Sequence, residues 1–474
     1  MKQSLTIGRV NLIYFYSICL YAFFLPTFNN LTPLMLILLL VLTFADYKSI
    51  KRFWLEEKRS VIAMGLPIVF TLSSISLCYS SNLNEGLKLI FRNAPLLLTP
   101  LVLFKVSFFE RKQLNVIYAL FVIGCIMTIF YSFSLVVYEV IDGGYKKVHS
   151  PENYVRYFLN RITYHDLVSL NRVNHSIYFG AYILLAIVLL NVKSNLFTNS
   201  IRKGFLFILF VTLVLLTPII IAISGLIIFT LIHLLKYENI KTKANRFKLL
   251  KVNAFWAFLV FYLFVWKLQP HLEYIYIFNN IKYNFLIIGG VLVTVVIGQV
   301  AYQIYQYKLI EKSILWGFSL VIIMTFILLL YPFNLDAFKL SNYTARLVNN
   351  YSSIQILKNN FFLGVGVGDI QDSLVNIYRE LRFRKLSYNE HNQYFRFWLG
   401  SGVLTFLIFL IWVVKLIVIS VQRKDFILIC VSITFSLFCF TESVLARQMG
   451  ICFFLFFIFF IYYSFSNKTN HENY

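Results

Sequence analysis

Apolar runs of membrane-spanning length recur along almost the whole chain. A hydrocarbon core of roughly 30 Å requires about 20 consecutive apolar residues in a helix, and windows of this kind follow one another through the sequence. Backbone polar groups inside a bilayer have to be satisfied within their own segment, so such runs fold as transmembrane helices. The sequence therefore predicts an all-α, polytopic membrane protein.

The apolar windows and the polar breaks between them predict about 12 to 14 transmembrane helices. The run from Gly204 to Leu235 is too long for one span, and Pro218 divides it, because proline removes a helix hydrogen bond. The expected spans lie near residues 10–26, 31–45, 60–78, 87–104, 114–139, 173–191, 204–217, 219–236, 249–267, 285–305, 313–331, 394–416, 426–442 and 449–465.

The chain contains two long polar connections, and the second of them, a large outer loop, separates an expected N-terminal transmembrane bundle from a C-terminal transmembrane part. Lysine and arginine in the short connections predict that both termini are cytoplasmic and that the two long connections lie outside. The expected parts are 1–331, with an outer loop at about 140–172, then 332–393, and finally 394–474 with a short cytoplasmic tail.

The net charge of +23 is spread mainly over short loops, which favours orientation in a membrane over nucleic-acid binding. The first apolar segment lacks a small-residue cleavage site, so no cleavable signal peptide is expected. The cysteines lie in or beside apolar segments without metal-binding or disulfide-framework spacing, so they are interpreted as apolar packing residues. They are Cys19, Cys78, Cys125, Cys430, Cys439 and Cys452.

A polar stretch over residues 343–402 is rich in lysine and arginine, although the positive-inside tendency predicts no enrichment in an outer loop. An anionic ligand at the outer face would explain this charge. The spacing of Leu347, Ile354 and Leu357 predicts an amphipathic helix over 343–359 that lies near the membrane interface.

A glycine-rich turn follows this predicted helix, with alternating glycines up to Gly368. Glycines permit positive φ, and a turn of successive amides can hold an anion, although a plain structural turn is an equal alternative. Asp369 and Asp372 are three residues apart and could share a helix face. No outer acidic pair has the spacing or setting of a metal site, so neither a metal nor another cofactor is expected.

His391 lies in a polar segment immediately before the twelfth predicted span. An unperturbed imidazole pKa near 6.5 suits a general base that takes a proton from a sugar hydroxyl. The alternative is a solvated or helix-capping histidine. The basic residues before it, and Gly400-Ser401-Gly402 after it, favour the catalytic interpretation.

Together these features resemble the family of O-antigen ligases and polymerases, bacterial membrane glycosyltransferases that use undecaprenyl-pyrophosphate glycans. The matching region covers about residues 345–415, and the residues that carry the resemblance are Arg346, Gly364, Gly366, His391 and Asn392. The resemblance implies a site on the periplasmic face of the inner membrane. It implies His391 as the base, Arg346 beside the leaving pyrophosphate, and the glycines and Asn392 in substrate binding.

Weaker family-like features occur elsewhere. Arg92 lies in an apolar run, where it either binds substrate or extends to the interface, and His175 opens the sixth span. Family members carry an arginine where this chain has Gly225, so the candidates for that role are Arg92, Arg161 and Arg172. Glu442 and Arg447, near the last outer turn, also allow the interpretation of an interfacial ion pair.

The acceptor is left open between two enzymes. A ligase transfers the glycan to lipid A core, which the single His391 and the arginine-rich loop favour, whereas a polymerase transfers it to a second lipid-linked glycan. A flippase or transporter of lipid-linked glycans is the alternative from another class, but such proteins place charges near the bilayer midplane. A purely structural membrane protein would leave the basic outer loop unexplained. Membrane lipids are expected partners, and the sequence does not predict the oligomeric state.

Overall fold

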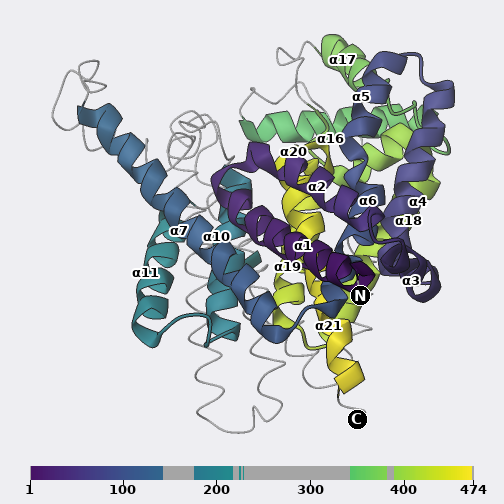
Figure 1. Ribbon diagram of the computed structural model, residues 1–474. Coiled ribbons are helices and arrows are strands. Elements are labelled where there is room, and N and C mark those ends of the chain that lie inside the picture. The colour runs from purple at the N-terminus through teal and green to yellow at the C-terminus, as the bar shows by residue number, and fades with distance from the viewer. Residues whose placement is uncertain are drawn as a thin grey trace, which may run out of the picture.

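The computed structural model describes residues 2–141, 176–216, 224–225, 228, 342–381 and 389–471 of the chain. Every regular element within these residues is a helix, and no strand occurs among them (Figure 1). The predicted all-α class is therefore confirmed. Four expected spans, 219–236, 249–267, 285–305 and 313–331, and nearly all of the loop 140–172 lie outside the described residues, apart from isolated positions.

The helices follow one another in the order α1 Lys2–Thr27, η1 Asn29–Leu31, α2 Thr32–Phe44, α3 Tyr47–Glu57, α4 Val61–Ile75, η2 Ser76–Tyr79, α5 Leu83–Asn93, α6 Pro95–Leu103, η3 Phe104–Phe108, α7 Arg111–Ile141, α10 Ser176–Val192, α11 Asn199–Leu216, α16 Asn342–Asn359, α17 Ile370–Glu380, α18 Gln393–Gln422, α19 Phe426–Thr441, η6 Val444–Ala446, α20 Gln448–Gly450, η7 Ile451–Leu455 and α21 Phe456–His471.

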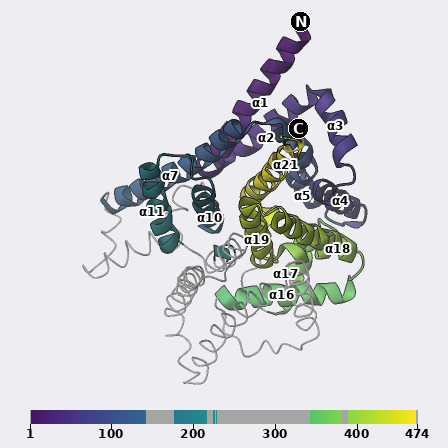
Figure 2. The same ribbon diagram turned by 90° about the horizontal axis from the view of Figure 1, so that it is seen from below.

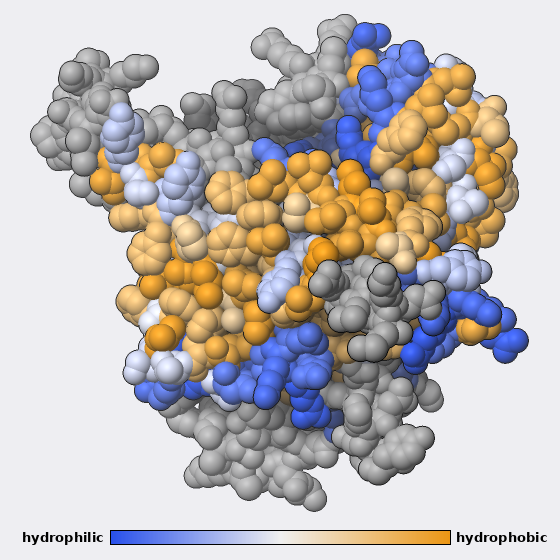
Figure 3. Space-filling model, in the orientation of Figure 1, coloured by the Kyte–Doolittle hydropathy of each residue, from blue (hydrophilic) through white to orange (hydrophobic). Residues whose placement is uncertain are grey.

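Several of these helices are long and apolar enough to cross a membrane. Among the described residues there are five such stretches, or six if the bent pair α2 and α3 counts as one span: Val61–Tyr79, Leu83–Phe108, Arg111–Leu135, Gln393–Gln422 and Gln448–Phe465. An apolar band crosses the middle of the molecule, with hydrophilic residues above and below it (Figure 3). The protein is therefore a membrane-embedded helical protein, and the five stretches coincide with expected spans.

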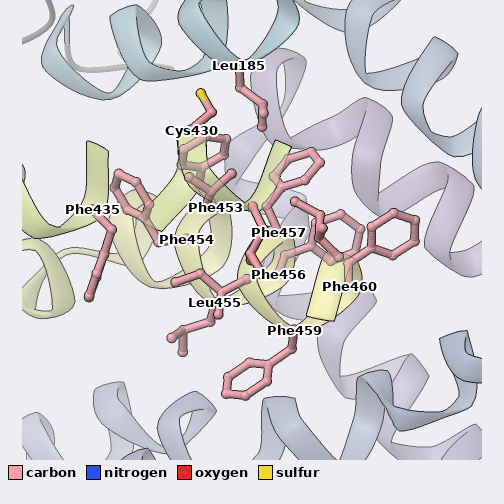
Figure 4. Close-up of a cluster of buried hydrophobic side chains, with 14 of the residues drawn as sticks. Leu185, Cys430, Phe435, Phe453, Phe454, Leu455, Phe456, Phe457, Phe459 and Phe460 are labelled. Atoms are coloured by element: carbon pink, nitrogen blue, oxygen red, sulfur yellow. The ribbon is translucent and has the colours of Figure 1, made fainter. Parts of the chain in front are cut away.

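The last apolar helix, α21, lies at the centre of the bundle. Helices α7, α10 and α11 lie on one side of it, and α4, α5 and α18 on the other (Figure 2). Phenylalanines point from it in several directions (Figure 4). The ring of Phe456 stacks on Tyr21 of α1 with centroids 4.6 Å apart, and Phe457 meets Phe121 of α7 at the same distance. A helix that is apolar on all sides is a buried helix, so its sequence agrees with this position.

Two of the expected spans contain an interruption of the helix, although each still forms one apolar stretch of membrane-spanning length. The stretch expected at 87–104 divides into α5 and α6 at Pro95, so Arg92 lies in the last turn of the amphipathic helix α5. The stretch expected at 394–416 is the start of α18, but Gly402 inside it has φ 80° and ψ 177°, which is not helical. The two turns of α18 before Gly402 therefore run in a different direction from the long apolar part.

The polar connections gather at two ends of the bundle. At one end, Asp46 pairs with the buried Lys105 at 3.0 Å, and Arg423 lies over the ring of Tyr462 at 4.6 Å. Burial opposes ionisation of Asp46, but hydrogen bonds from Ser49 and Lys105 outweigh it and lower the Asp46 pKa. These residues come from the connections expected on the cytoplasmic side, and they share one end of the bundle.

The other end carries α16, α17 and the turns at residues 79–83, 389–392 and 442–447 (Figure 1). Helix α16 confirms the helix expected over 343–359, and its position near the membrane interface stays a prediction. It buries Asn349, Ser352 and Ser353 completely as well as Leu357, and it packs against α17 and the start of α18. Part of its polar side therefore belongs to the protein core, in addition to the expected apolar stripe. This end is called the α16–α17 end below.

Candidate active site

His391 lies in the turn that precedes α18, and its backbone has φ 47°. Positive φ is uncommon for a residue with a side chain, and histidine is one of the residue types enriched there. Such backbone strain often occurs where the surrounding structure fixes a functional side chain. The imidazole is 19% exposed, and its Nδ1 lies 3.1 Å from Oε2 of Glu442. His391 is therefore held at the surface of the α16–α17 end by a carboxylate.

Glu442 immediately follows α19, and its side chain is 6% exposed. The sequence suggested Glu442 and Arg447 as a pair, whereas the structure brings the Glu442 carboxylate to His391. The break at Gly402 produces this contact. A straight α18 would be about 45 Å long against about 24 Å for α19, so His391 would lie far beyond Glu442. The kinked start of α18 instead packs on α19, where Tyr394 meets Phe440 with ring centroids 4.6 Å apart.

A second set of contacts fixes the segment that carries His391. Glu390 is completely buried, and its Oε1 accepts hydrogen bonds from Nη1 of Arg396 at 3.0 Å and from Oγ of Ser443 at 2.7 Å. The side chain of Gln393 accepts a hydrogen bond from the amide of Leu445 at 2.7 Å. A buried carboxylate is tolerated where such partners compensate its lost hydration. These bonds join the 389–393 segment to the 442–447 turn.

The amide side chain of Asn392 caps α18. Its Oδ1 accepts hydrogen bonds from the amides of Tyr394 and Phe395 at 3.0 and 3.2 Å, which satisfies two backbone donors at the helix start. Asn392 is only 8% exposed. The structure thus gives Asn392 a positioning role for the helix next to His391, and its expected contact with substrate stays a prediction.

Arg92 and α10 border the same site. Nη1 of Arg92 donates to the carbonyl oxygen of Ala446 at 3.2 Å, so α5 ends beside the turn that carries Glu442. Tyr178 in the first turn of α10 is buried, and its ring lies near Gly450 and Phe438. Helix α5, helix α10 and the segment 442–450, which are far apart in the sequence, therefore meet at one place.

The remaining expected site residues are only partly accounted for. Arg346 lies in the first half of α16, and its side chain is outside the description. Arg161, Arg172 and His175 lie outside the described residues. Gly225, which stands where the resemblance leads us to expect an arginine, is buried and helical. The structure therefore places Arg92 beside the 442–447 turn, whose Glu442 contacts His391, and the placement of the other cations stays a prediction.

The glycine-rich turn packs against the protein itself. Gly366 has φ 95°, and a Cβ there would lie 3.0 Å from the Cα of Ser80. A Cβ on Gly364 would lie 2.7 Å from the carbonyl oxygen of Trp398. Amides of the turn donate within the protein, including Val365 to the Leu399 carbonyl oxygen at 2.7 Å. Both glycines therefore serve close packing, and an additional role in substrate binding is a prediction that these contacts do not test.

Asp369 and Asp372 form hydrogen bonds to the turn before α5. The two oxygens of Asp369 accept from the amides of Ser81 and Asn82 at 2.7 and 2.8 Å. Oδ2 of Asp372 accepts from Nδ2 of Asn82 at 3.0 Å. Within the described ranges, no group of three or more histidine, cysteine or acidic residues has an arrangement that would bind a metal ion.

Comparison with protein-family models and with curated proteins returned no match for this chain. The resemblance to the ligase and polymerase family therefore rests on the motif residues of the sequence.

Proposed function

We propose that this protein is a membrane glycosyltransferase of the O-antigen ligase type. It transfers a glycan from undecaprenyl pyrophosphate to a sugar hydroxyl of lipid A core, on the periplasmic face of the bacterial inner membrane. The observation that carries this proposal is the 3.1 Å contact between His391 and Glu442 at the α16–α17 end. A carboxylate on one imidazole nitrogen is the arrangement that orients a histidine general base.

In this mechanism His391 deprotonates the acceptor. When Nδ1–H donates to Glu442, the lone pair of the neutral ring lies on Nε2, which takes the proton of the acceptor hydroxyl. The hydroxyl oxygen forms a bond to the anomeric carbon while the bond from that carbon to the pyrophosphate oxygen breaks. Undecaprenyl pyrophosphate leaves with the electron pair, and the anomeric centre inverts. Because pyrophosphate is already a good leaving group, cationic side chains suffice and no metal is required.

Arginine side chains would neutralise that leaving group. A guanidinium stays charged and forms paired hydrogen bonds to phosphate oxygens. Arg92 already reaches the carbonyl of Ala446, beside the Glu442 turn. Arg346 on α16 is the second candidate. Arg161 and Arg172, together with Arg92, remain candidates for the role left by Gly225, and His175 remains a candidate for substrate binding.

The proposed topology has about 12 to 14 spans with both termini in the cytoplasm. The separation of the connections into two ends supports it. The end with Asp46, Lys105 and Arg423 would face the cytoplasm, and the α16–α17 end would face the periplasm.

The test uses membranes from cells that lack their own ligase and polymerase, supplied with undecaprenyl-pyrophosphate glycan and either lipid A core or more lipid-linked glycan. Glycan on lipid A core would support the ligase, and longer lipid-linked chains would identify a polymerase. His391→Ala should abolish either product, while the exposed Glu380→Ala on α17 should retain it. Absence of both products from folded, inserted wild type would contradict the proposal and favour a transporter.

A further inference from the structure

A polar cleft of about 940 Å³ opens at the α16–α17 end, away from His391. One wall is the turn at residues 79–84 before α5, and the other consists of the glycine-rich turn and α17. Hydrophilic residues cover this part of the surface around α5 and α17 (Figure 3). Gly364, a predicted substrate-binding residue, lines the cleft, and none of the other lining residues has a role in the mechanism proposed above.

Helix α17 presents a polar face to the cleft. Asp369, Asp372, Ser373 and Asn376 line it at spacings of three and four residues, which places them on one side of the helix. The opposite side packs into the protein through residues such as Leu374, which is completely buried. Packing of the apolar side therefore fixes which side chains reach the cleft.

The walls of the cleft are joined by direct bonds. Both oxygens of Asp369 accept backbone amides from the opposite wall, at 2.7 and 2.8 Å. The hydroxyl of Tyr79 donates to the carbonyl oxygen of Leu363 at 2.7 Å. Gly368 approaches so closely that a Cβ there would lie 3.1 Å from the amide of Gly86. The cleft is therefore formed before any ligand enters, which reduces the ordering cost of binding.

The lining suits uncharged sugars. Asn84 and Asn376 offer amides that both donate and accept, as sugar hydroxyls require, and Asn360, whose Nδ2 donates to the Ile356 carbonyl oxygen, offers its side-chain oxygen. Tyr79 is 41% exposed and offers a flat aromatic face. The lining includes two carboxylates, Asp369 and Asp372, and no basic side chain among the residues that the structure describes, so it disfavours a pyrophosphate.

From these observations we infer that the cleft is a binding subsite for the neutral sugars of a glycan, separate from the pyrophosphate site. Helix α5 joins the two places. It starts beside the cleft at Leu83, and Arg92 in its last turn contacts the Glu442 turn. An 11-residue helix is about 16 Å long, so a glycan extended along α5 would reach from the cleft to Arg92, beside the turn that carries Glu442. This inference rests on the proposed function in that a glycan is the substrate.

The test measures binding and transfer on the full-length protein in lipid nanodiscs. The probe is the lipid-free oligosaccharide released by mild acid from the undecaprenyl-pyrophosphate glycan of the source cells, with inorganic pyrophosphate as a second probe. The cleft variant is Asn84→Ala/Asn376→Ala, which truncates two exposed side chains. The control, Lys88→Ala/Glu380→Ala, changes two exposed residues on the same helices outside the cleft.

We expect the cleft variant to weaken oligosaccharide binding by about tenfold or more, because two hydrogen bonds are lost. It should raise the KM for glycan while kcat changes little, and it should leave pyrophosphate binding unchanged. The control and His391→Ala should bind oligosaccharide as wild type does. Equal oligosaccharide binding by wild type and cleft variant, or no binding by wild type at millimolar concentration, would overturn the inference.

The two proposals fail separately in this experiment. Oligosaccharide binding that depends on Asn84 and Asn376, without any glycan transfer by wild type, would support the subsite and contradict the transferase. Glycan transfer with an unchanged KM in the cleft variant would contradict the subsite and leave the transferase standing.

Discussion

Gly402→Ala should destabilise the protein and disturb the junction that places His391. At this position the backbone has φ 80° and ψ 177°, a region that is essentially restricted to glycine. A Cβ would also lie 2.7 Å from the carbonyl carbon of Phe362 and 2.8 Å from that of Leu363, so the two backbones would have to separate. The glycine-rich turn would then lose its close contact with α18.

The expected magnitude has two parts. Backbone strain at such a position costs about 1 to 3 kcal/mol. Separation of the backbones would also break the 3.2 Å hydrogen bond from the Val403 amide to the Phe362 carbonyl oxygen, which is worth about 1 kcal/mol. The variant should therefore lose about 2 to 4 kcal/mol of stability. Gly204→Ala in α11 is the matched control, because a Cβ there meets no heavy atom within 4 Å.

The assay follows heat unfolding of purified protein with a dye that reacts with thiols. Five cysteines are buried and become reactive on unfolding, and Cys78→Ser removes the exposed one from the background. Since membrane proteins often unfold irreversibly, apparent midpoints are compared at one heating rate. Gly402→Ala should unfold at a clearly lower temperature, and Gly204→Ala at the parent temperature or above. An unchanged midpoint for Gly402→Ala would refute the packing argument.

Three further predictions concern single side chains. Glu442→Gln should lower kcat by about 10²-fold with little change in KM. An amide that donates to Nδ1 of His391 leaves the hydrogen on Nε2, so that Nε2 cannot take the proton of the acceptor. Steady-state transfer kinetics check this, and an unchanged kcat would contradict it. Asp46→Asn should cost about 3 kcal/mol at neutral pH, because it leaves Lys105 buried without its carboxylate. Because the pKa of Asp46 is lowered in the folded state, the stability that its ion pair contributes is fully present above about pH 3.9 and is lost as pH falls through the folded-state pKa. The difference in unfolding temperature between wild type and Asp46→Asn should therefore shrink in acid. A difference that stays constant with pH would count against the pair. Tyr378→Phe should lower the free energy of unfolding by about 1 to 3 kcal/mol, because Oδ1 of the buried Asn349 on α16 loses the hydroxyl that donates to it. The same heat-unfolding assay would detect this loss. A midpoint equal to that of wild type would show that the hydrogen bond is dispensable.

Much of the helical framework was predictable from sequence because bilayer thickness sets the length of an apolar run. The expected span 60–78 agrees with the apolar stretch Val61–Tyr79, and 449–465 agrees with Gln448–Phe465. The central position of α21 also had a signal, since its phenylalanines occur on every side of the helix. Which helices pack against one another was harder to predict, because apolar runs of similar composition do not determine which neighbour each helix contacts.

The candidate site was predictable only in part. His391 was identified from its polar setting, but its partner Glu442 lies 51 residues away and meets it only because α18 breaks at Gly402. The Gly400-Ser401-Gly402 motif signalled an unusual backbone without giving its direction. Glu390 and Arg396 are six residues apart, a spacing that does not predict a pair within one helix. Their contact depends on the non-helical turn around His391.

The proposed transferase is tested most directly by release of the leaving group from purified protein. Wild type and His391→Ala would be reconstituted in nanodiscs, where no ion gradient exists, and given lipid-linked glycan with lipid A core as acceptor. The account predicts that wild type releases undecaprenyl pyrophosphate in step with glycosylated lipid A core, and that His391→Ala is slower by about 10² to 10⁴-fold. Equal release by both proteins would contradict the role of His391, and no release by folded wild type would contradict glycan transfer to lipid A core.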